Sequence, residues 1–131
     1  VIDDGDGMDL MDAKMCVLPH ATSKIKNEND LYFISTLGFR GEALAAISSV
    51  SEVTLDTFDG SEATKVQINY GKFAEPTIGS MRQGTIIEVK NLFYNVPARL
   101  KFMKSLNTEL NLCVSYIEKI SLSLPDSIDT L

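Results

Sequence analysis

Two runs of alternating apolar and polar residues lie near the middle of the chain. Residues 53–58 and 64–70 both alternate, and Asp59 and Gly60 stand between them. Because successive side chains of a strand point to opposite faces, this pattern predicts two half-buried strands joined by a tight turn. Residues 85–89, which follow Gly84, are apolar enough for a strand in the interior of a sheet.

Weaker strand signals lie on either side of this hairpin. Val1 and Ile2 have the character of the end of a buried strand, which runs into an acidic, glycine-rich turn at residues 3–7. Residues 73–78 form a further candidate strand, which Pro76 interrupts. Proline has no N–H to donate to a β-ladder, so this strand is expected at the edge of a sheet.

Four segments carry helical signals. Asp9 is expected to cap a helix whose apolar positions continue to the residue before Pro19, where the helix ends. A second helix is expected over residues 42–49, and a third over residues 97–104, because proline suits the first turn of a helix. The last helix, from residue 108 to residue 124, has an apolar stripe along one side.

These elements predict an α+β fold, a two-layer sandwich of a mixed, mostly antiparallel sheet with helices on one face. The 131 residues suffice for one domain with its own core. We expect an internal part of a longer protein, because the chain begins within a strand signal and has no initiator methionine.

Composition is that of a soluble globular protein, with 44% hydrophobic and 23% charged residues. No apolar run approaches the length of a membrane span and no signal peptide is present, so no membrane partner is expected. Cys16 and Cys113 match no metal-ligand spacing. We expect two reduced, largely buried thiols, which favours an intracellular protein.

The net charge of −6 disfavours nucleic-acid binding by the chain as a whole. Any DNA role must therefore depend on a local patch or on another part of a larger protein. Arg99, Lys101 and Lys104 form a small basic patch and are the candidate DNA contacts. Runs of charge more often mark a solvated surface, and that alternative is the favoured one on charge alone.

A glycine-bracketed arginine stands immediately before the second predicted helix. Unpaired N–H groups and the positive end of the helix dipole favour an anion at such a helix start, most simply a phosphate. Taken in isolation, a tight turn that leads into a helix cap is the commoner meaning of this pattern. The candidate phosphate-binding residues are Gly38, Phe39, Arg40 and Gly41.

The acidic turn at the start of the chain suits a purine site. A carboxylate such as that of Asp3 can accept from the exocyclic amine of adenine, and guanine would present an oxygen there instead. Gly5 and Gly7 leave room for a flat ring, and Thr85 could supply a hydroxyl to it. The alternative, that Asp3 merely caps a turn, is equally supported by spacing alone.

A long polar segment follows the first predicted helix. Thr22, Ser23 and Lys24 offer two hydroxyls and an ammonium group, a set suited to phosphate contacts. By composition alone, a solvated polar loop is the favoured interpretation. A loop of this length inside a compact domain is usually functional or disordered.

Four segments together resemble a known family. They are Asp3-x-Gly5-x-Gly7-Met8, HATSKI at residues 20–25, GFRGEAL at residues 38–44 and FYNVPARLKF at residues 93–102. In this order and at about this spacing they resemble the MutL family of DNA mismatch repair proteins. That family belongs to the GHKL clan of ATPases, with the gyrase B subunit, heat-shock chaperones and sensor histidine kinases. The second and fourth segments are particular to MutL homologues.

The resemblance implies that residues 1–131 are part of an ATP-binding domain with the Bergerat fold of that clan, with the next domain absent or barely reached. It implies that Asp3 binds the adenine amine, that Gly7 lines the base pocket and that Thr85 completes that pocket. It places residues 22–24 in an ATP lid of about residues 20–41. It assigns the backbone N–H groups of residues 38–41 to the phosphates.

In this family the catalytic Glu and the Mg²⁺-binding Asn lie on a helix upstream of the Asp-x-Gly motif. The resemblance therefore assigns no catalytic residue and no metal ligand to this segment. It implies an ATPase parent that uses ATP and Mg²⁺, and a segment that by itself hydrolyses ATP negligibly, because the base and the metal are both missing.

The implied partners are a MutS-type mismatch recognition protein, a second MutL-type chain in a homo- or heterodimer, and DNA, mainly through the full-length dimer. ATP would order the lid and drive dimerisation. The implied location is intracellular: the cytoplasm or nucleoid of a bacterium, or the nucleus of a eukaryote.

Two alternatives stay open at this point. One is a relative that binds nucleotide or acts as a scaffold without turnover. The other is a topoisomerase or chaperone of the same clan, which the segments at residues 20–25 and 97–102 disfavour.

Overall fold

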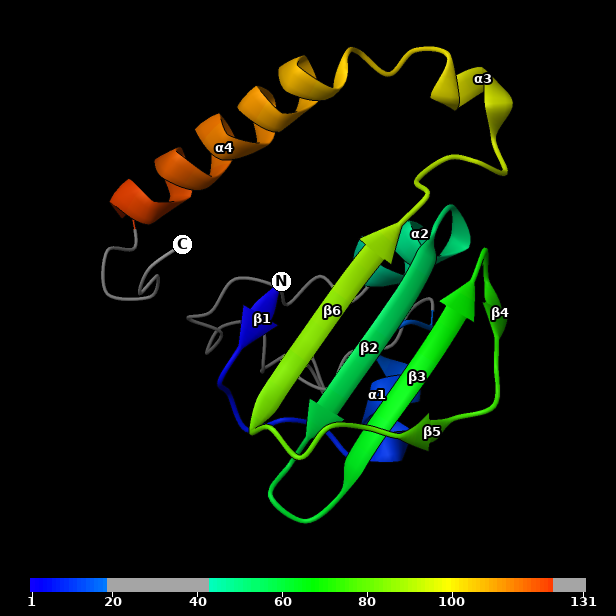
Figure 1. Cartoon of the computed structure of the whole chain (residues 1–131), viewed down its shortest axis with the longest axis vertical. Coiled ribbons are helices and arrows are strands. Elements are labelled where there is room, and N and C mark those ends of the chain that lie inside the picture. The colour runs from blue at the N-terminus through cyan, green and yellow to red at the C-terminus, as the bar shows by residue number, and fades with distance from the viewer. Residues whose placement is uncertain (19–42, 124–131) are drawn as a thin grey trace, which may run out of the picture. The chain divides into compact units, whose positions relative to one another are not determined.

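The computed structural model of the chain describes residues 1–18 and 43–123 (Figure 1). The chain divides into two compact units, residues 1–97 and residues 98–131. The proposed lid at residues 20–41 lies outside the described residues. The elements in order are β1 (Ile2–Asp3), α1 (Leu10–Met15), α2 (Ala43–Ser49), β2 (Glu52–Phe58), β3 (Ala63–Asn69), β4 (Lys72–Phe73), β5 (Thr77–Ile78), β6 (Gly84–Lys90), α3 (Pro97–Leu100) and α4 (Leu106–Ser123).

All strands of the first unit belong to one sheet, in the order β1-β6-β2-β3-β4, with β5 also paired to β3. Every described pair is antiparallel. The central strand β2 pairs along its whole length with β3 on one side and with β6 on the other. The hairpin, the interior position of β6 and the largely antiparallel sheet are thus confirmed.

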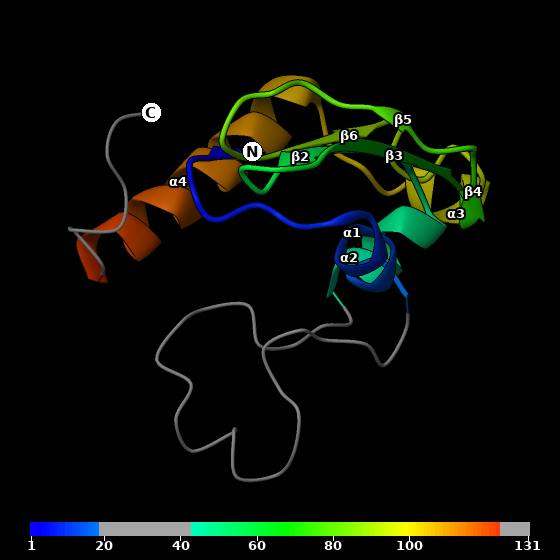
Figure 2. The ribbon, with the colours of Figure 1, turned by 90° about the horizontal axis from the view of Figure 1, so that it is seen from below.

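Helices α1 and α2 both cover one face of this sheet, as Figure 2 shows with the sheet seen edge-on. Because β2 and β3 alternate, every second side chain points into that layer. There Leu55 lies beside its cross-strand partner Val66, and Val53 lies beside Ile68. Ala13 of α1 packs into the same buried cluster. The predicted two-layer α+β sandwich with helices on one face is confirmed.

Local signals placed most element boundaries well. Asp9 caps α1, because its Oδ1 accepts from the N–H of Asp12 at 2.8 Å. In the β2–β3 turn, Asp59 Oδ1 accepts from the N–H groups of Ser61 at 2.9 Å and Glu62 at 2.7 Å. The expected strand at residues 73–78 is present as two short edge pieces on either side of Pro76, β4 and β5.

Three predictions about the elements were wrong. The first strand is exposed rather than buried, with Val1 92% and Ile2 66% exposed, because β1 is at an end of the strand order. Helix α1 ends at Met15, well before Pro19. Helix α3 spans only Pro97–Leu100, and turn bonds to Phe102 and Met103 follow it, so the expected helix does not continue to residue 104.

In the second unit, α4 begins two residues before its predicted start. Ser105 caps it, because the N–H of Thr108 donates to Ser105 Oγ at 3.3 Å. The Glu109 carboxylate accepts in turn from the N–H of Lys104 at 2.8 Å. Cys113 is exposed on α4, so the expectation of two buried thiols holds only in part, for Cys16. Among the described helices, none combines the length and apolar character that a membrane crossing requires.

Candidate functional site

The pairing of β1 with β6 places Asp3 opposite Thr85, residues that lie far apart in the sequence (Figure 1). The Thr85 N–H donates to Asp3 Oδ1 at 3.1 Å, and the Gly5 N–H donates to the same oxygen at 3.0 Å. Two donors on one oxygen fix the orientation of the carboxylate. Among the described residues, no protein donor reaches Oδ2, which leaves this oxygen as an acceptor for a ligand N–H.

The turn after Asp3 lies tightly against the end of β2. Gly7 has a φ of +73°, and a Cβ there would come within 2.0 Å of the Phe58 carbonyl oxygen. The next N–H, of Met8, donates to Thr57 Oγ1 at 2.9 Å. Packing against β2 is therefore a sufficient reason for glycine at this position. The proposed space for a flat ring beside Gly5 and Gly7 stays a prediction.

The loop before β6 holds the same turn from the other side. Arg82 Nη1 donates to the backbone oxygen of Asp3 at 2.8 Å, and Gln83 Nε2 donates to that of Gly5 at 2.9 Å. Gly84, at φ +104°, lets the two backbones approach closely, because a Cβ there would lie 2.2 Å from the backbone oxygen of Asp3. The sequence carried no signal for the side-chain contacts of Arg82 and Gln83.

A row of three buried threonines crosses the helix-facing side of the sheet beside this turn. Thr57 pairs with Thr64 of β3 and with Thr85 of β6, and all three are buried. The hydroxyl oxygens of Thr57 and Thr85 lie 2.9 Å apart. The apolar core at Leu55 and Val66 thus gives way to hydroxyl groups at the end of the sheet where Asp3 lies.

Sequence reasoning missed Thr57. The signal was present, because position 57 falls on the same face of the alternating strand as Val53 and Leu55. A hydroxyl at a core position has to find a hydrogen-bond partner inside the protein. Thr57 therefore marks the place where the core changes into a polar site.

The arrangement combines a fixed carboxylate, with one free acceptor oxygen, and a buried hydroxyl one strand away. Such a pair suits a flat heterocycle with an N–H donor along its edge. The described residues contain no cluster of three or more His, Cys, Asp or Glu side chains that could hold a metal ion. The chemistry visible in this part of the chain is recognition by hydrogen bonds.

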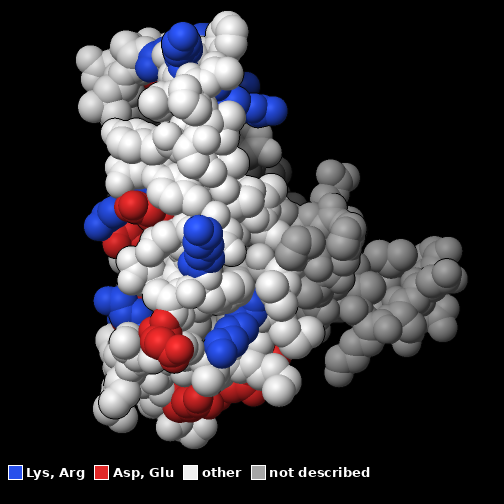
Figure 3. All heavy atoms as spheres, turned by 90° about the vertical axis from the view of Figure 1, so that its right-hand side faces the viewer, with Lys and Arg blue, Asp and Glu red and all other residues white. Residues whose placement is uncertain are grey.

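Several predicted site residues cannot be placed against this arrangement. Thr22, Ser23 and Lys24 and the phosphate-binding segment at residues 38–41 lie outside the described residues. Arg99, Lys101 and Lys104, the candidate DNA contacts, are exposed in the second unit, on α3 and in the segment after it. In the view of Figure 3, most of the described surface carries neither basic nor acidic side chains, and in its lower part the two kinds lie close together.

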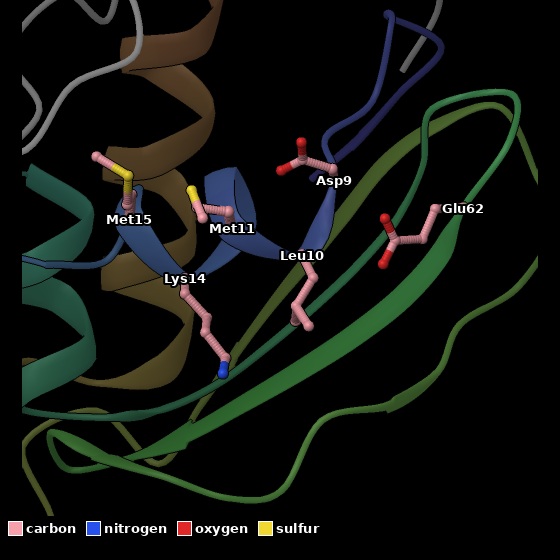
Figure 4. A pocket seen from close by; sticks show the side chains of 6 residues that line it. All are labelled: Asp9, Leu10, Met11, Lys14, Met15 and Glu62. Carbon is pink, nitrogen blue, oxygen red and sulfur yellow. The ribbon is translucent and has the colours of Figure 1, made fainter.

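A separate hollow of about 460 Å³ lies beside α1, where Leu10, Met11 and Met15 form an apolar lining (Figure 4). Its charged groups are at the margin. One of them, the carboxylate of Asp9, already caps the helix. The hollow offers apolar surface without converging polar groups, so it lacks the features of a chemical site.

No protein-family model matches the chain. The chain is 49% identical over 127 residues to the DNA mismatch repair protein MutL of Listeria innocua, an alignment that covers 96% of this chain and 21% of the relative. It is 49% identical over 128 residues to the MutL of Clostridium botulinum, covering 96% of this chain and 19% of that one. The chain thus spans about a fifth of the length of these curated relatives.

Solved structures agree with this similarity. The chain superposes on the Aquifex aeolicus MutL ATPase domain complexed with ADP with a TM-score of 0.71 at 28% identity, covering 95% of this chain and 42% of that one. It superposes on the N-terminal domain of a DNA repair protein with a TM-score of 0.66 at 30% identity, covering 88% of this chain and 33% of that one.

Proposed function

The chain belongs to the MutL family of DNA mismatch repair proteins, and from this we propose that it forms part of an ATP-binding domain whose complete protein hydrolyses ATP. Its sheet has the fold of the MutL ATPase domains, the GHKL fold. The observation that carries the proposal is the carboxylate of Asp3 beside Thr85. Its Oδ1 accepts hydrogen bonds from the N–H groups of Gly5 and Thr85, and its Oδ2 remains available to accept from a ligand.

In the proposed complex, Asp3 Oδ2 accepts from the exocyclic amine of adenine, and the Thr85 hydroxyl contacts the same edge of the base. Guanine has a carbonyl oxygen where adenine has the amine, so two acceptors would face one another without a proton. Asp3 is exposed in this structure, contrary to the buried carboxylate that such a site needs, so the proposal requires that the bound base cover it. Once covered, the unpaired acceptors would be buried, and a site of this kind can reject the wrong base by roughly 10⁴-fold. The support is the geometry of Asp3 and the ADP named for the related Aquifex aeolicus domain.

From the resemblance to the family, we propose that residues 38–41 and the lid residues Thr22, Ser23 and Lys24 bind the phosphates of the nucleotide. Backbone N–H groups beside glycines and a helix start favour phosphate charge, and Arg40 adds a cation. Gly5 and Gly7 complete the list of proposed ATP-binding residues. Their proposed part is to keep the turn close to the base.

Hydrolysis needs a general base and a metal ion in addition to the residues that bind the nucleotide. Mg²⁺, when bound, neutralises charge that develops on the transferred phosphoryl group. No cluster of acidic ligands for it occurs in the described part of the chain. We propose that the metal ligand and the general base come from elsewhere in the complete domain, and that these residues alone have negligible turnover.

The proposed biological role is that of a nucleotide-dependent coordinator in mismatch repair. ATP would promote association of two such domains, as a homo- or heterodimer, and signal to a MutS-type protein and to DNA. Arg99, Lys101 and Lys104 are the proposed DNA contacts of this segment. We place the protein inside the cell, with the DNA that it repairs.

Asp3→Asn in the full natural protein that carries this sequence tests the proposal. Asparagine can still accept from Gly5 and Thr85 through its oxygen, but it turns an NH₂ group toward the ligand. We expect ATP affinity to fall by about 10- to 100-fold, the effect of losing a hydrogen bond to a charged group.

Asp6→Asn is the matched control, because it removes one carboxylate from the same exposed turn without touching the bonds of Asp3. Its ATP affinity should stay within twofold of the natural protein. Fluorescent-nucleotide titration and single-turnover hydrolysis measure both variants. Unchanged affinity in a folded Asp3→Asn protein would remove the adenine contact, and absence of any saturable ATP binding by the natural protein would remove the proposed function.

A further inference from the structure

Helix α2 ends at Ser49, and the carbonyl groups at and just after its end have no partners within the helix. Donors from outside the helix supply four consecutive carbonyl oxygens here: that of Ser48 accepts from the Gly71 N–H at 2.8 Å, that of Ser49 from the Asn95 side chain at 3.2 Å, that of Val50 from the Phe93 N–H at 2.7 Å and that of Ser51 from the Tyr70 N–H at 2.9 Å. The donors belong to two segments, the turn after β3 and the segment after β6 (Figure 1). We call these four bonds the α2 anchor.

The backbone adopts an unusual conformation where these donors lie. In the described part of the chain, the residues other than glycine with a positive φ are Tyr70 at +50°, Asn91 at +53° and Phe93 at +65°. Tyr70 and Phe93 donate to the α2 anchor, and the Asn91 carbonyl oxygen joins the two segments by accepting from the Tyr70 hydroxyl at 3.1 Å. Bulky residues rarely adopt this conformation, and they keep it only where the surrounding structure holds them. The two segments and the end of α2 therefore hold one another in place.

Asn95 differs from the other three donors because it uses its side chain. A carbonyl oxygen can only accept, so the NH₂ group of the amide must point to Ser49. A substitution can therefore remove this bond and leave the backbone donors of the anchor in place. Asn95 lies in the segment at residues 93–102 that is particular to the family. The proposed DNA contacts lie further along the chain, so they do not account for it.

Helix α2 has only seven residues, too few for its own hydrogen bonds to stabilise it. Its position therefore depends on its packing against β2 and β3 and on the α2 anchor. In the sequence, Glu42 alone separates this helix from residues 38–41, which are proposed to bind the phosphates. Because a helix of this length moves as a stiff unit, a displacement of its last turn also displaces its start.

We propose that Asn95 is a positioning residue for phosphate binding: its bond to Ser49 holds α2, and α2 fixes where residues 38–41 meet the phosphates. This inference rests on the proposed function, since it concerns the same bound nucleotide. It goes further by giving part of the ATP affinity to a residue that acts through Ser49.

The test compares the affinities for ATP and for adenosine of the full natural protein with those of Asn95→Ala and Asn95→Asp. Alanine removes the donor, and aspartate places an acceptor opposite the Ser49 oxygen. We expect ATP affinity to fall about three- to tenfold in the alanine variant and at least as much in the aspartate variant. Adenosine has no phosphate, so its affinity should stay within twofold. Competition against a fluorescent ATP analogue measures both ligands.

Hydrogen exchange of residues 43–51 without nucleotide is the second measurement. Loss of the Asn95 bond should accelerate exchange there in both variants. Unchanged exchange would show that Asn95 does not hold α2, and it would overturn the proposal. Faster exchange with an unchanged ATP-to-adenosine preference would show a merely structural role, and it would overturn the proposal equally. Asn95 is exposed, so we expect both variants to fold; should one fail, the other decides.

Asn91→Gly is the matched control. Asn91 is an exposed asparagine of the same segment, but its Nδ2 donates to Glu52 Oε2 at 2.8 Å and not to α2. Glycine suits its positive φ. Both the ATP-to-adenosine preference and the exchange of residues 43–51 should match the natural protein, and a fall equal to that in Asn95→Ala would overturn the assignment to Asn95. Failure of the natural protein to bind ATP overturns the proposed function instead, so the two failures are distinct.

Discussion

Two glycines in the same backbone conformation provide a test of how the Asp3 turn is held. Gly7 and Gly71 have φ values of +73° and +85°, so alanine meets the same left-handed strain at both positions. That strain costs about 1–2 kcal/mol per residue. Their surroundings differ, because a Cβ at Gly7 would lie 2.0 Å from the Phe58 oxygen, whereas a Cβ at Gly71 would have nothing within 4 Å.

The additional cost of Gly7→Ala follows from the contact that it disturbs. The overlap with Phe58 can be relieved only by moving the turn more than 1 Å away from β2, since ordinary contact begins at 3.4 Å. That movement separates the Met8 N–H from Thr57, which lie 2.9 Å apart. An unsatisfied buried donor costs about 1–3 kcal/mol. We therefore expect the free energy of unfolding to fall by about 2–5 kcal/mol in Gly7→Ala and by about 1–2 kcal/mol in Gly71→Ala.

Hydrogen exchange of backbone amides, followed by mass spectrometry of peptides from β2 and β6, measures these free energies in the intact protein. Gly7→Ala should lower protection in both strands and weaken ATP binding, because the turn carries Asp3. Gly71→Ala should leave ATP binding unchanged. Equal losses of protection in the two variants would refute the argument that close packing against Phe58, rather than conformation alone, requires glycine at position 7.

Two further predictions concern pH. Burial raises the pKa of the Cys16 thiol to about 11, so at pH 8 little of it is thiolate, the reactive form. Iodoacetamide should therefore label the exposed Cys113 first, and Cys16 should become reactive only as the pH rises towards 11; equal labelling rates at pH 8 would contradict this. Hydrogen bonds from Glu62 and Ser61 lower the pKa of Asp59 below the ordinary carboxyl value of 3.8. The charged carboxylate therefore stabilises the β2–β3 turn fully at pH values above 3.8. This stabilisation is lost as the pH falls through the lowered pKa. Asp59→Ala should accelerate amide exchange in residues 59–62 at pH 7. In acid the exchange rates of the variant and of the natural protein should become equal. A difference in rate that persists in acid would argue against stabilisation of the turn by the charged carboxylate.

Much of the fold was readable in the sequence, because its signals are local. The alternation in β2 and β3 reports which side chains enter the core, independently of what covers them. The cap at Asp9 and the turn at Asp59 depend on bonds to residues two or three positions away. The end of α1 was misjudged for the complementary reason: apolar residues continue past Met15 because they pack on the sheet, although they are no longer helical.

The candidate site was readable in part. The sequence supplied Asp3, Gly7 and Thr85 as a chemically sensible set. The structure joins Asp3 and Thr85 by a hydrogen bond and places Gly7 in the adjoining turn, packed against Phe58. Their contact with ATP stays a prediction, as does every role given to residues 22–24 and 38–41. Arg82 and Gln83 were missed, because their bonds to the turn join residues that are far apart in the chain.

By itself, the sequence determined the alternation of the strands, the local caps and turns, and the motifs that mark the family, since each of these depends on neighbours within a few residues. Tertiary structure decided that β1 is an exposed edge, that Asp3 lies against Thr85, and that the core ends in a row of threonines. The physical reason is that strand register acts between distant residues: a hydroxyl in β2 acquires its partners only when β6 and the first turn are paired beside it.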